Sequence, residues 1–372
     1  MRVGIVAPFS WSFWGGVVDH VDHQARVLRE LGVDAKIIIG NDPPGPLTRM
    51  LHTRPGRHDE PPSHVLPVGR TVMIPANASL ANVVLTPQSM GRMRRIFREQ
   101  RFDVVHVHEP FAPLLSAYAL AKVDCPLVVT CHSSGGRWLP VGRVLWGRLL
   151  RERIDHRIAV SEQARRAALP HVRGEFEVIP NGVELPPAPR FDGREHRVVF
   201  VGRHEPRKGL QVLLKAWPAI AARTGASLRV IGTDLLAARL LMRRLSVTDD
   251  AVEILGVLPA EALQHELSTA KLLVAPAVGA ESFGLVLAQA FASGTPVVAS
   301  AISGYTEVAD ESSGVLVPPG DIGALEDAAV GILENERRRQ ELAHAGRARA
   351  EERYDWRLIG RRLLSIYELL TE

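Results

Sequence analysis

Cysteine is scarce in this chain: only Cys125 and Cys131 occur among 372 residues. They flank the apolar run 126–130, and an extended strand of that length holds their Cα atoms roughly 20 Å apart. A disulfide requires a Cα separation below ~7 Å. We therefore expect two free thiols in a reducing compartment, which favours the cytoplasm.

Long apolar runs and an excess of one charge are also lacking. No segment approaches the ~20 apolar residues of a membrane-spanning helix, and Met1 leads directly into the apolar run Val3–Ala7 without the regions of a signal peptide. The 45 Lys and Arg against 41 Asp and Glu leave a net charge of +4, which alone indicates no partner. We expect a cytoplasmic protein with at most a peripheral contact at the inner face of the plasma membrane.

Several site motifs are missing as well. Neither half of the chain has Gly-x-Gly-x-x-Gly followed by an acidic residue about twenty positions later, which disfavours an NAD-dependent enzyme. No recognition helix or basic platform interleaved with aromatics is present, so we expect no nucleic-acid partner. His106 and His108 share one face of a strand, but no third ligand stands at a diagnostic spacing. We therefore predict no metal site, and structural or substrate-lining roles for both histidines.

What the sequence does contain is a regular alternation of short apolar runs with longer helical patterns. Such runs are typical of parallel strands that helices cover on both faces. In the first half they are Val3–Ala7, Ala35–Ile39, Val104–Val107, Leu127–Thr130, Arg157–Val160 and Phe176–Ile179. In the second half they are Val198–Val201, Leu228–Ile231, Val252–Leu255, Leu272–Ala275, Pro296–Ala299 and Val315–Val317.

The alternation breaks once, in the proline-rich segment Gly182–Pro189, and then restarts. We predict an α/β chain of two Rossmann-like domains, residues 1–184 and 190–353, and expect a C-terminal amphipathic helix within 354–372 to pack back on the first domain. Residues 41–64 are rich in Pro and basic residues and lack periodicity; a surface loop and a substrate-side lid both remain open.

Two β-α loops have the composition of phosphate-binding sites. Gly15-Gly16 opens the first helix, where backbone N–H groups and the helix dipole favour an anion, although a tight turn would also use these glycines. The segment 202–209 (GRHEPRKG) follows the first strand of the second half, the position at which doubly wound folds bind ligands. Its cations Arg203, Arg207 and Lys208 predict a clamp on a diphosphate; the alternative is a solvated basic loop.

Two further segments carry chemistry at strand ends. We expect Glu281 to begin a helix in which Gln289 stands a little over two turns later; dipole stabilisation alone would explain a carboxylate there. His132 ends the strand that starts at Pro126 and should point into a crevice at the sheet edge, although a lone histidine is more often structural.

A basic helix is predicted over residues 90–101. Arg92, Arg94, Arg95, Arg98 and Arg101 interleave with Met90, Met93, Ile96 and Phe97. This pattern fits an interfacial helix attracted to anionic lipid, and it also fits a surface helix that packs its apolar stripe inward.

Taken together, these motifs resemble glycosyltransferase family 4 and its GT-B fold over nearly the whole chain. The segments, in the family's order, are Gly15-Gly16, HVHEP (106–110), CH (131–132), IPNGVE (179–184), GRHEPRKGL (202–210) and ESFGLVLAQAFASGTPVVAS (281–300). Within the family the chain is similar to the actinobacterial phosphatidylinositol mannosyltransferases, especially through EPRKG and AESFG. The resemblance implies two domains whose parallel sheets face each other across a cleft.

The resemblance also implies roles for individual residues. Gly16 would offer its backbone N–H to the donor diphosphate, and Arg203 and Lys208 would neutralise that group as it leaves. Glu281 would bind hydroxyls of the transferred sugar, and His132 would contact the sugar near the reacting carbon. The remaining donor-binding positions are Ser282, Phe283, Gly284, Leu285 and Gln289.

Two departures from the family pattern stand out. The position that holds the nucleotide ribose is normally glutamate, whereas Gln289 can accept the same hydrogen bond only without charge assistance. On the acceptor side, Val18, Ala76 and Asn82 replace polar and aromatic groups near a strand at Ile74-Pro75, while Asn77, Ser133 and Arg137 remain as candidate contacts. The loss of polar groups there argues for a different acceptor.

The resulting hypothesis is a retaining transferase that moves a sugar from a nucleotide-sugar to a hydroxyl of a lipid or small-molecule acceptor. GDP-mannose is the first expectation for the donor and UDP-sugars the next. No cofactor is required and no Asp-x-Asp ion site is present, although Mg²⁺ remains compatible with the diphosphate. A phosphorylase or epimerase of the same fold, and a nucleotide-binding relative with weak or no activity, are the alternatives.

Overall fold

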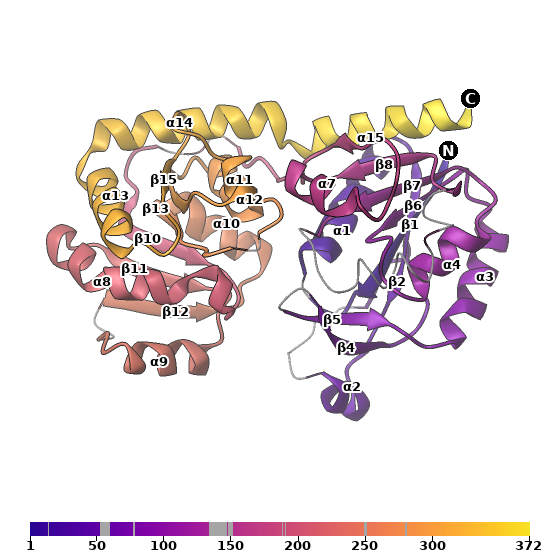
Figure 1. Ribbon diagram of the computed structural model, residues 1–372, viewed down its shortest axis with the longest axis horizontal. Coiled ribbons are helices and arrows are strands. Elements are labelled where there is room, and N and C mark those ends of the chain that lie inside the picture. The colour runs from indigo at the N-terminus through magenta and orange to yellow at the C-terminus, as the bar shows by residue number, and fades with distance from the viewer. Residues whose placement is uncertain are drawn as a thin grey trace. The chain divides into compact units, whose positions relative to one another are not determined.

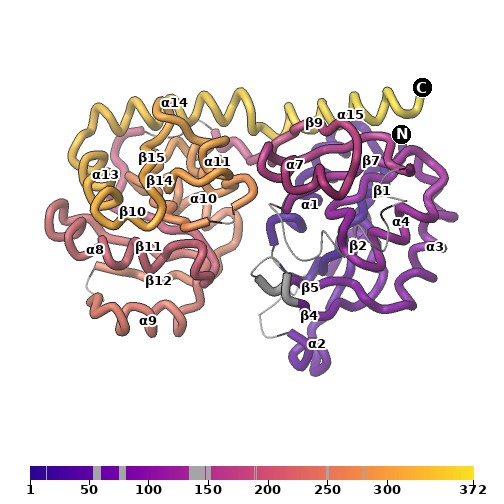
Figure 2. Tube along the Cα trace, viewed as in Figure 1, coloured from indigo at the N-terminus to yellow at the C-terminus, as the bar shows by residue number. Residues whose placement is uncertain are grey.

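The computed structural model describes residues 1–13, 15–52, 60–76, 79–133, 147, 152–187, 189, 191–248, 251–279 and 281–372. The chain divides into two compact units. The first comprises Met1–Gly182 and Trp356–Glu372, and the second comprises Val183–Asp355. Both ends of the chain therefore belong to the first unit, as the indigo and yellow segments show in Figures 1 and 2.

The first unit is built on a sheet in which the described residues form seven parallel strands, in the order β3-β2-β1-β6-β7-β8-β9. Apolar residues on alternate positions serve the two faces of this sheet. The strands are β1 (Arg2–Ser10), β2 (Asp34–Gly40), β3 (Val65–Pro67), β6 (Val104–His108), β7 (Leu127–Cys131), β8 (His156–Ala159) and β9 (Glu177–Val178).

Helices cover both faces of this sheet. Ile5 and Ile37 pack with α1 (Gly16–Glu30) and α15 (Trp356–Thr371) on one face. Val6 and Ile38, their neighbours along the strands, pack into the other cluster. Among the described residues, the helices of that second face are α3 (Gln88–Gln100), α4 (Leu115–Lys122) and α7 (Glu162–Ala168).

The segment 41–64 is more structured than its composition indicates. It contains α2 (Pro46–Leu51), and Asp42 is buried at its start. The Asp42 carboxylate accepts hydrogen bonds from Ser10 Oγ at 2.7 Å and from Thr71 Oγ1 at 2.6 Å, which ties the segment to β1 and to an antiparallel hairpin. That hairpin consists of β4 (Thr71–Ala76) and β5 (Ser79–Val84).

The second unit repeats the plan. Its described residues form six parallel strands in the order β12-β11-β10-β13-β14-β15, and a core of Phe200, Trp217 and Leu325 lies between sheet and helices. The strands are β10 (Glu195–Val201), β11 (Ser227–Ile231), β12 (Val252–Gly256), β13 (Ala270–Ala275), β14 (Val297–Ser300) and β15 (Val315–Val317). The helices are η1 (Pro206–Lys208), α8 (Leu210–Thr224), α9 (Leu235–Arg244), α10 (Ala260–Thr269), α11 (Leu285–Ala292), α12 (Ser303–Thr306), α13 (Ile322–Glu334) and α14 (Glu336–Arg353).

These sheets confirm the predicted α/β class with two Rossmann-like units, and every predicted apolar run overlaps a strand. The short strand β3 and the pairing of the β4–β5 hairpin were not predicted. Three residues carry too little periodicity for a prediction, and Pro75 weakens the strand signal of β4.

The packing of α15 on α1 gives a first testable prediction. A Cβ at Gly360 would lie 2.2 Å from Val27 Cγ1, whereas a Cβ at Gly91, also within a helix of the first unit, would meet no atom within 4 Å. Replacing glycine by alanine inside a helix gains up to ~1 kcal/mol in helix propensity. We therefore expect Gly91→Ala to stabilise the unit and Gly360→Ala to destabilise it by about 1–3 kcal/mol through overpacking.

Urea denaturation of the two variants, followed by hydrogen exchange in the first unit, measures the difference. Equal stabilisation by both substitutions would show that α15 does not press on α1 at this point.

Candidate functional site

Three imidazoles from distant parts of the sequence meet in the first unit. His20 lies on α1, His108 ends β6 and His132 follows β7. The parallel register pairs His108 with Thr130, which brings His132 beside it: His108 Nδ1 lies 2.8 Å from His132 Nε2. The ring of His20 packs edge-on against His132, with 4.8 Å between centroids. All three side chains are buried.

The cluster is also a candidate constellation for a metal ion. One nitrogen from each ring lies within 4.8 Å of the other two. His20 was not predicted beside His108, because only the fold brings this α1 residue to the end of the strand. Two nitrogens bound at ~2.05 Å to a tetrahedral ion would be roughly 3.3 Å apart, so the 2.8 Å contact of His108 and His132 fits a hydrogen bond better.

Burial keeps these rings uncharged. Desolvation lowers the pKa of His20 to about 3 and the pKa values of His108 and His132 well below their ordinary value. His106, stacked on His108 at 4.5 Å, has its pKa lowered to about 3 for the same reason. His106 bonds Thr130 Oγ1 at 2.7 Å and the hydroxyl of Tyr367 at 2.6 Å, which links the strand to α15.

The partly buried side chain of Glu109 fixes the backbone that carries His132. The backbone N–H of His132 donates to Glu109 Oε1 at 3.1 Å, and Ser133 donates to the same carboxyl group. Burial raises the pKa of Glu109 to about 7, and these two hydrogen bonds oppose the rise. Glu109 has a positive φ of 52°, a conformation that costs a non-glycine residue energy and that the surrounding contacts must sustain.

The predicted glycine loop lies at the N-terminus of α1. Gly16 is the first residue of the helix, and Gly15 precedes it in an extended conformation with φ of −172°. A Cβ at either position would meet no atom within 4 Å. Neither the backbone conformation nor packing within the described residues therefore requires glycine here.

In the second unit the predicted cations lie among carboxylates. Glu205, buried, pairs with Arg203 at 3.0 Å and with Arg207 at 2.7 Å. Glu281 pairs with Lys208 at 2.8 Å and with Arg207. Glu205 was not predicted as a site residue, although it stands inside the GRHEPRKGL segment. Three cations against two carboxylates leave a positive excess at the end of β10.

Glu281 does not begin a helix, contrary to the prediction. Helix α11 begins at Leu285, and Gly284 before it has a φ of 87°, a left-handed conformation that separates the turn 281–284 from the helix. Ser282 and Phe283 lie in this turn, and Gln289 is the fifth residue of α11 instead of standing two turns into a helix. The chain turns so that Glu281 reaches the cations of the β10 loop.

The residues considered for the acceptor side lie in different surroundings. Val18 is buried in the first unit's core, so this position faces the protein interior. Asn82 lies on β5 and its Oδ1 is 3.0 Å from His52 Nδ1. Asn77 and Arg137 lie outside the described residues, as does the side chain of Ala76. Ser133 lies beside His132 through the shared Glu109 contact.

The apolar residues of helix α3 lie on one side of the helix and its arginines on the other. Met93 is fully buried, and Ile96 and Phe97 pack against the same core cluster. Its arginines at 92, 94, 95 and 98 are exposed. The apolar stripe therefore packs inward, and the outer face of the helix is basic.

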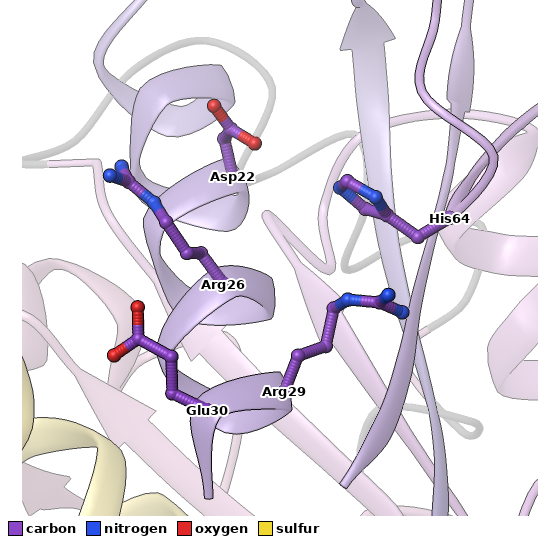
Figure 3. Close-up of a pocket in the computed structure, with 5 residues that line it drawn as sticks. All are labelled: Asp22, Arg26, Arg29, Glu30 and His64. Carbon is purple, nitrogen blue, oxygen red and sulfur yellow. The ribbon is translucent and has the colours of Figure 1, made fainter. Parts of the chain in front are cut away.

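A shallow pocket lies apart from the predicted residues. Its volume is about 370 Å³ and it is lined by Asp22, Arg26, Arg29, Glu30 and His64 (Figure 3). Four of these side chains project from the middle and the C-terminal end of α1, away from Gly15 and Gly16 at its start. The pocket mixes both charges and contains none of the predicted site residues.

The comparisons with known proteins agree with these motifs. Glycosyltransferase Family 4 matches residues 14–185, and Glycosyl transferases group 1 matches residues 195–335. The phosphatidyl-myo-inositol mannosyltransferase of Mycobacterium leprae is 35% identical over 100% of this chain and 97% of its own length. The chain belongs to glycosyltransferase family 4.

Other relatives extend the comparison. The phosphatidyl-myo-inositol mannosyltransferase of Mycolicibacterium smegmatis is 36% identical over 100% of this chain and 94% of its own. A GDP-mannose-dependent monoacylated alpha-(1-6)-phosphatidylinositol monomannoside mannosyltransferase of Corynebacterium glutamicum is 27% identical over 80% of this chain and 82% of its own.

Solved structures agree in fold. Sucrose-phosphate synthase from Thermosynechococcus elongatus has a TM-score of 0.75 at 22% identity, covering 99% of this chain and 98% of its own. Anabaena HepE, in complex with UDP and glucose, has a TM-score of 0.74 at 18% identity, covering 99% of each chain. This glycosyltransferase thus has the GT-B type of Rossmann-like units. Among its described helices, none has both the length and the apolar character needed to cross a bilayer.

The buried histidines predict how stability depends on pH. Their pKa values in the folded unit lie below the ordinary 6.5. Above pH 6.5 they therefore cost the folded unit no stability, whereas below it the unfolded chain takes up protons that the folded unit cannot, and the free energy of unfolding falls. Each histidine can lower the free energy of unfolding by up to about 1.4 kcal/mol per pH unit. Glu109 acts in the opposite direction, because its pKa is raised from 4.5 to about 7. Between these two pH values, its protonation on acidification stabilises the folded unit and offsets the loss caused by roughly one of the four histidines.

We expect the free energy of unfolding of the first unit to fall steeply below pH 6.5. Urea denaturation at several pH values, with hydrogen exchange of β6 and β7 as the probe, measures this. A stability that stays constant or rises on acidification to pH 5 would contradict the neutral buried state.

Proposed function

We propose that this family 4 glycosyltransferase transfers mannose from GDP-mannose to a hydroxyl of a membrane lipid, with retention of anomeric configuration. The observation that carries the proposal is the cluster of Arg203, Arg207, Lys208 and Glu281 at the carboxyl end of β10. Parallel α/β sheets bind ligands at this edge, and arginine and lysine are suited to a diphosphate. The names of the relatives support mannose and a phosphoinositide-type lipid. The different acceptor expected from the sequence rested partly on Val18, and that side chain is buried in the core of the first unit instead of lining a site.

The pairing within the cluster suggests how the donor is received. Without a ligand, the Glu281 carboxylate is the anionic partner of Lys208 and Arg207. A diphosphate that takes over Lys208, together with Arg203, frees Glu281 to accept hydrogen bonds from sugar hydroxyls. Glu205 retains Arg203 and Arg207 in place. The same cations can therefore hold the sugar-binding carboxylate and the leaving group in turn.

In the proposed reaction the acceptor hydroxyl attacks the anomeric carbon from the side on which the nucleoside diphosphate leaves. The bond from the anomeric carbon to the phosphate oxygen breaks, and the departing phosphate takes the hydroxyl proton. Arg203 and Lys208 stabilise the negative charge that grows on the phosphate, and His132 hydrogen-bonds the sugar. Gly16 contributes a backbone N–H at the start of α1, where glycine leaves room for a ligand.

Lys208 tests the assignment. Lys208→Ala should lower kcat by about 10²–10³ at saturating donor, because a cation that opposes transition-state charge is lost. Lys215→Ala removes an exposed lysine on α8 of the same unit and should leave kcat unchanged. Turnover of labelled GDP-mannose with phosphatidylinositol vesicles measures both. Wild-type turnover by the Lys208 variant would exclude this role.

Gln289 tests the nucleotide contact. Gln289→Glu should strengthen the ribose hydrogen bond, because charge assistance roughly doubles its energy, and GDP should bind roughly fivefold more tightly. Calorimetric titration with GDP and UDP measures the gain and compares the bases. If the affinity of the Gln289→Glu variant for GDP were unchanged or weaker, the ribose would not be bound by residue 289. GDP binding without transfer to any acceptor would favour a nucleotide-binding relative with little activity.

The basic face of α3 is the proposed contact with anionic lipid. Changing Arg94, Arg95 and Arg98 to Gln should weaken binding to vesicles containing anionic lipid by about 1 kcal/mol per arginine at low salt. The matched control changes the same number of exposed arginines, Arg239, Arg243 and Arg244 on α9, which lie beside the exposed Leu236 and Leu240. Vesicle co-sedimentation compares the two. A larger loss in the α9 variant would move the lipid contact to the second unit.

A further inference from the structure

The hydrogen bond between His108 and His132 constrains which nitrogen of His132 carries a proton. His108 Nδ1 and His132 Nε2 lie 2.8 Å apart, and the two ring planes are inclined by 29° with 5.1 Å between centroids. Burial keeps both imidazoles uncharged near neutral pH. A neutral imidazole has one N–H and one acceptor nitrogen. One ring therefore donates to the other, and only two arrangements are available.

The two arrangements differ in what they leave at His108 Nε2. This atom is buried and has no hydrogen-bond partner within the described part of the chain. If His132 donates from Nε2, His108 must carry its proton on Nε2, and a buried N–H is left without an acceptor. If His108 donates from Nδ1, its Nε2 is an unprotonated acceptor. Orphaned buried N–H groups are rarer than under-satisfied acceptors, which favours the second arrangement.

The surroundings hold His132 in this state. The edge of His20 packs against its ring, and Glu109 fixes its backbone N–H. Because Nε2 is engaged by His108, Nδ1 is the ring nitrogen left for a ligand. His106, on the same strand and equally buried, bonds Thr130 and Tyr367 instead. It therefore provides a matched comparison on the same face of β6.

We propose that His108 is a positioning residue: it donates a hydrogen bond from Nδ1 to His132 Nε2 and so fixes His132 as the Nδ1–H tautomer. His132 then serves as a hydrogen-bond donor to an oxygen of the ligand and does not act as a base. The use of this donor in catalysis rests on the proposed transferase function, whereas the tautomer itself does not. Loss of the hydrogen-bond partner that orients a metal-bound histidine typically costs about 10–100-fold in activity, and we expect a loss of similar size for the orientation of His132.

The test is a two-bond ¹H–¹⁵N spectrum of the full chain labelled with ¹⁵N-histidine, at pH 7.5, with His132 assigned from a His132→Asn variant. We expect His132 as Nδ1–H in the wild type. His108→Leu should release it to the Nε2–H form that free histidine favours, and should lower kcat about 10–100-fold. His108→Asn, whose amide can donate from nearly the position of Nδ1, should keep the tautomer and recover much of the activity.

His106→Leu is the control, since it removes a neighbouring buried imidazole without touching His132. It should leave the Nδ1–H signal unchanged. If His108→Leu prevents folding, His108→Gln keeps polarity but moves the donor to the position of Nε2, and should likewise release the tautomer.

Three results would overturn the proposal. They are an Nε2–H His132 in the wild type, an Nδ1–H signal that survives loss of the His108 donor, and one equivalent of metal that is lost in His20→Ala by elemental analysis. In the last case both nitrogens of the short contact would be ligands. A correct tautomer without any sugar transfer would instead refute the proposed function and leave the positioning role standing.

Discussion

The alignment of parallel strands is the constraint on which both candidate sites depend. In each unit the strands run in one direction, so their carboxyl ends share one edge of the sheet. In the first unit the register of β6 with β7 sets His108 beside His132. In the second, the loop after β10 meets the turn after β13, where Val278 N–H donates to Arg207 O at 2.8 Å. His108 and His132, and the two loops of the second unit, thus become neighbours through the order and register of the strands.

The two clusters accommodate their polar side chains in different ways. The first unit buries imidazoles in their uncharged form and connects them by hydrogen bonds, which avoids the cost of desolvating a charge. The second unit pairs each carboxylate with two cations. An excess positive charge remains there for an anionic ligand. The division suits the proposed reaction, in which the leaving group is anionic and the sugar is neutral.

The sequence predicted the two-unit α/β fold because buried parallel strands leave continuous apolar runs that restart after Pro186-Pro187. It also singled out the loop of Lys208, since clustered cations at a strand end are visible without coordinates. It could not predict His20 as a neighbour of His132, because that contact depends on the docking of α1 against the sheet. It misplaced the start of α11, because the apolar pattern does not reveal that Gly284 takes a left-handed conformation (φ 87°) before the helix. A side chain at this position would also be too close to Tyr305, since a Cβ would lie 2.8 Å from its ring.

Retention of configuration is the central chemical claim, and the product tests it most directly. The full chain is incubated with GDP-mannose labelled with ¹³C at the anomeric carbon and with lipid vesicles that contain phosphatidylinositol. The one-bond ¹³C–¹H coupling of the purified product then reports the configuration of the new linkage. The account predicts a mannosylated lipid with the same anomeric configuration as the donor. An inverted linkage, or hydrolysed mannose with no lipid product, would contradict it.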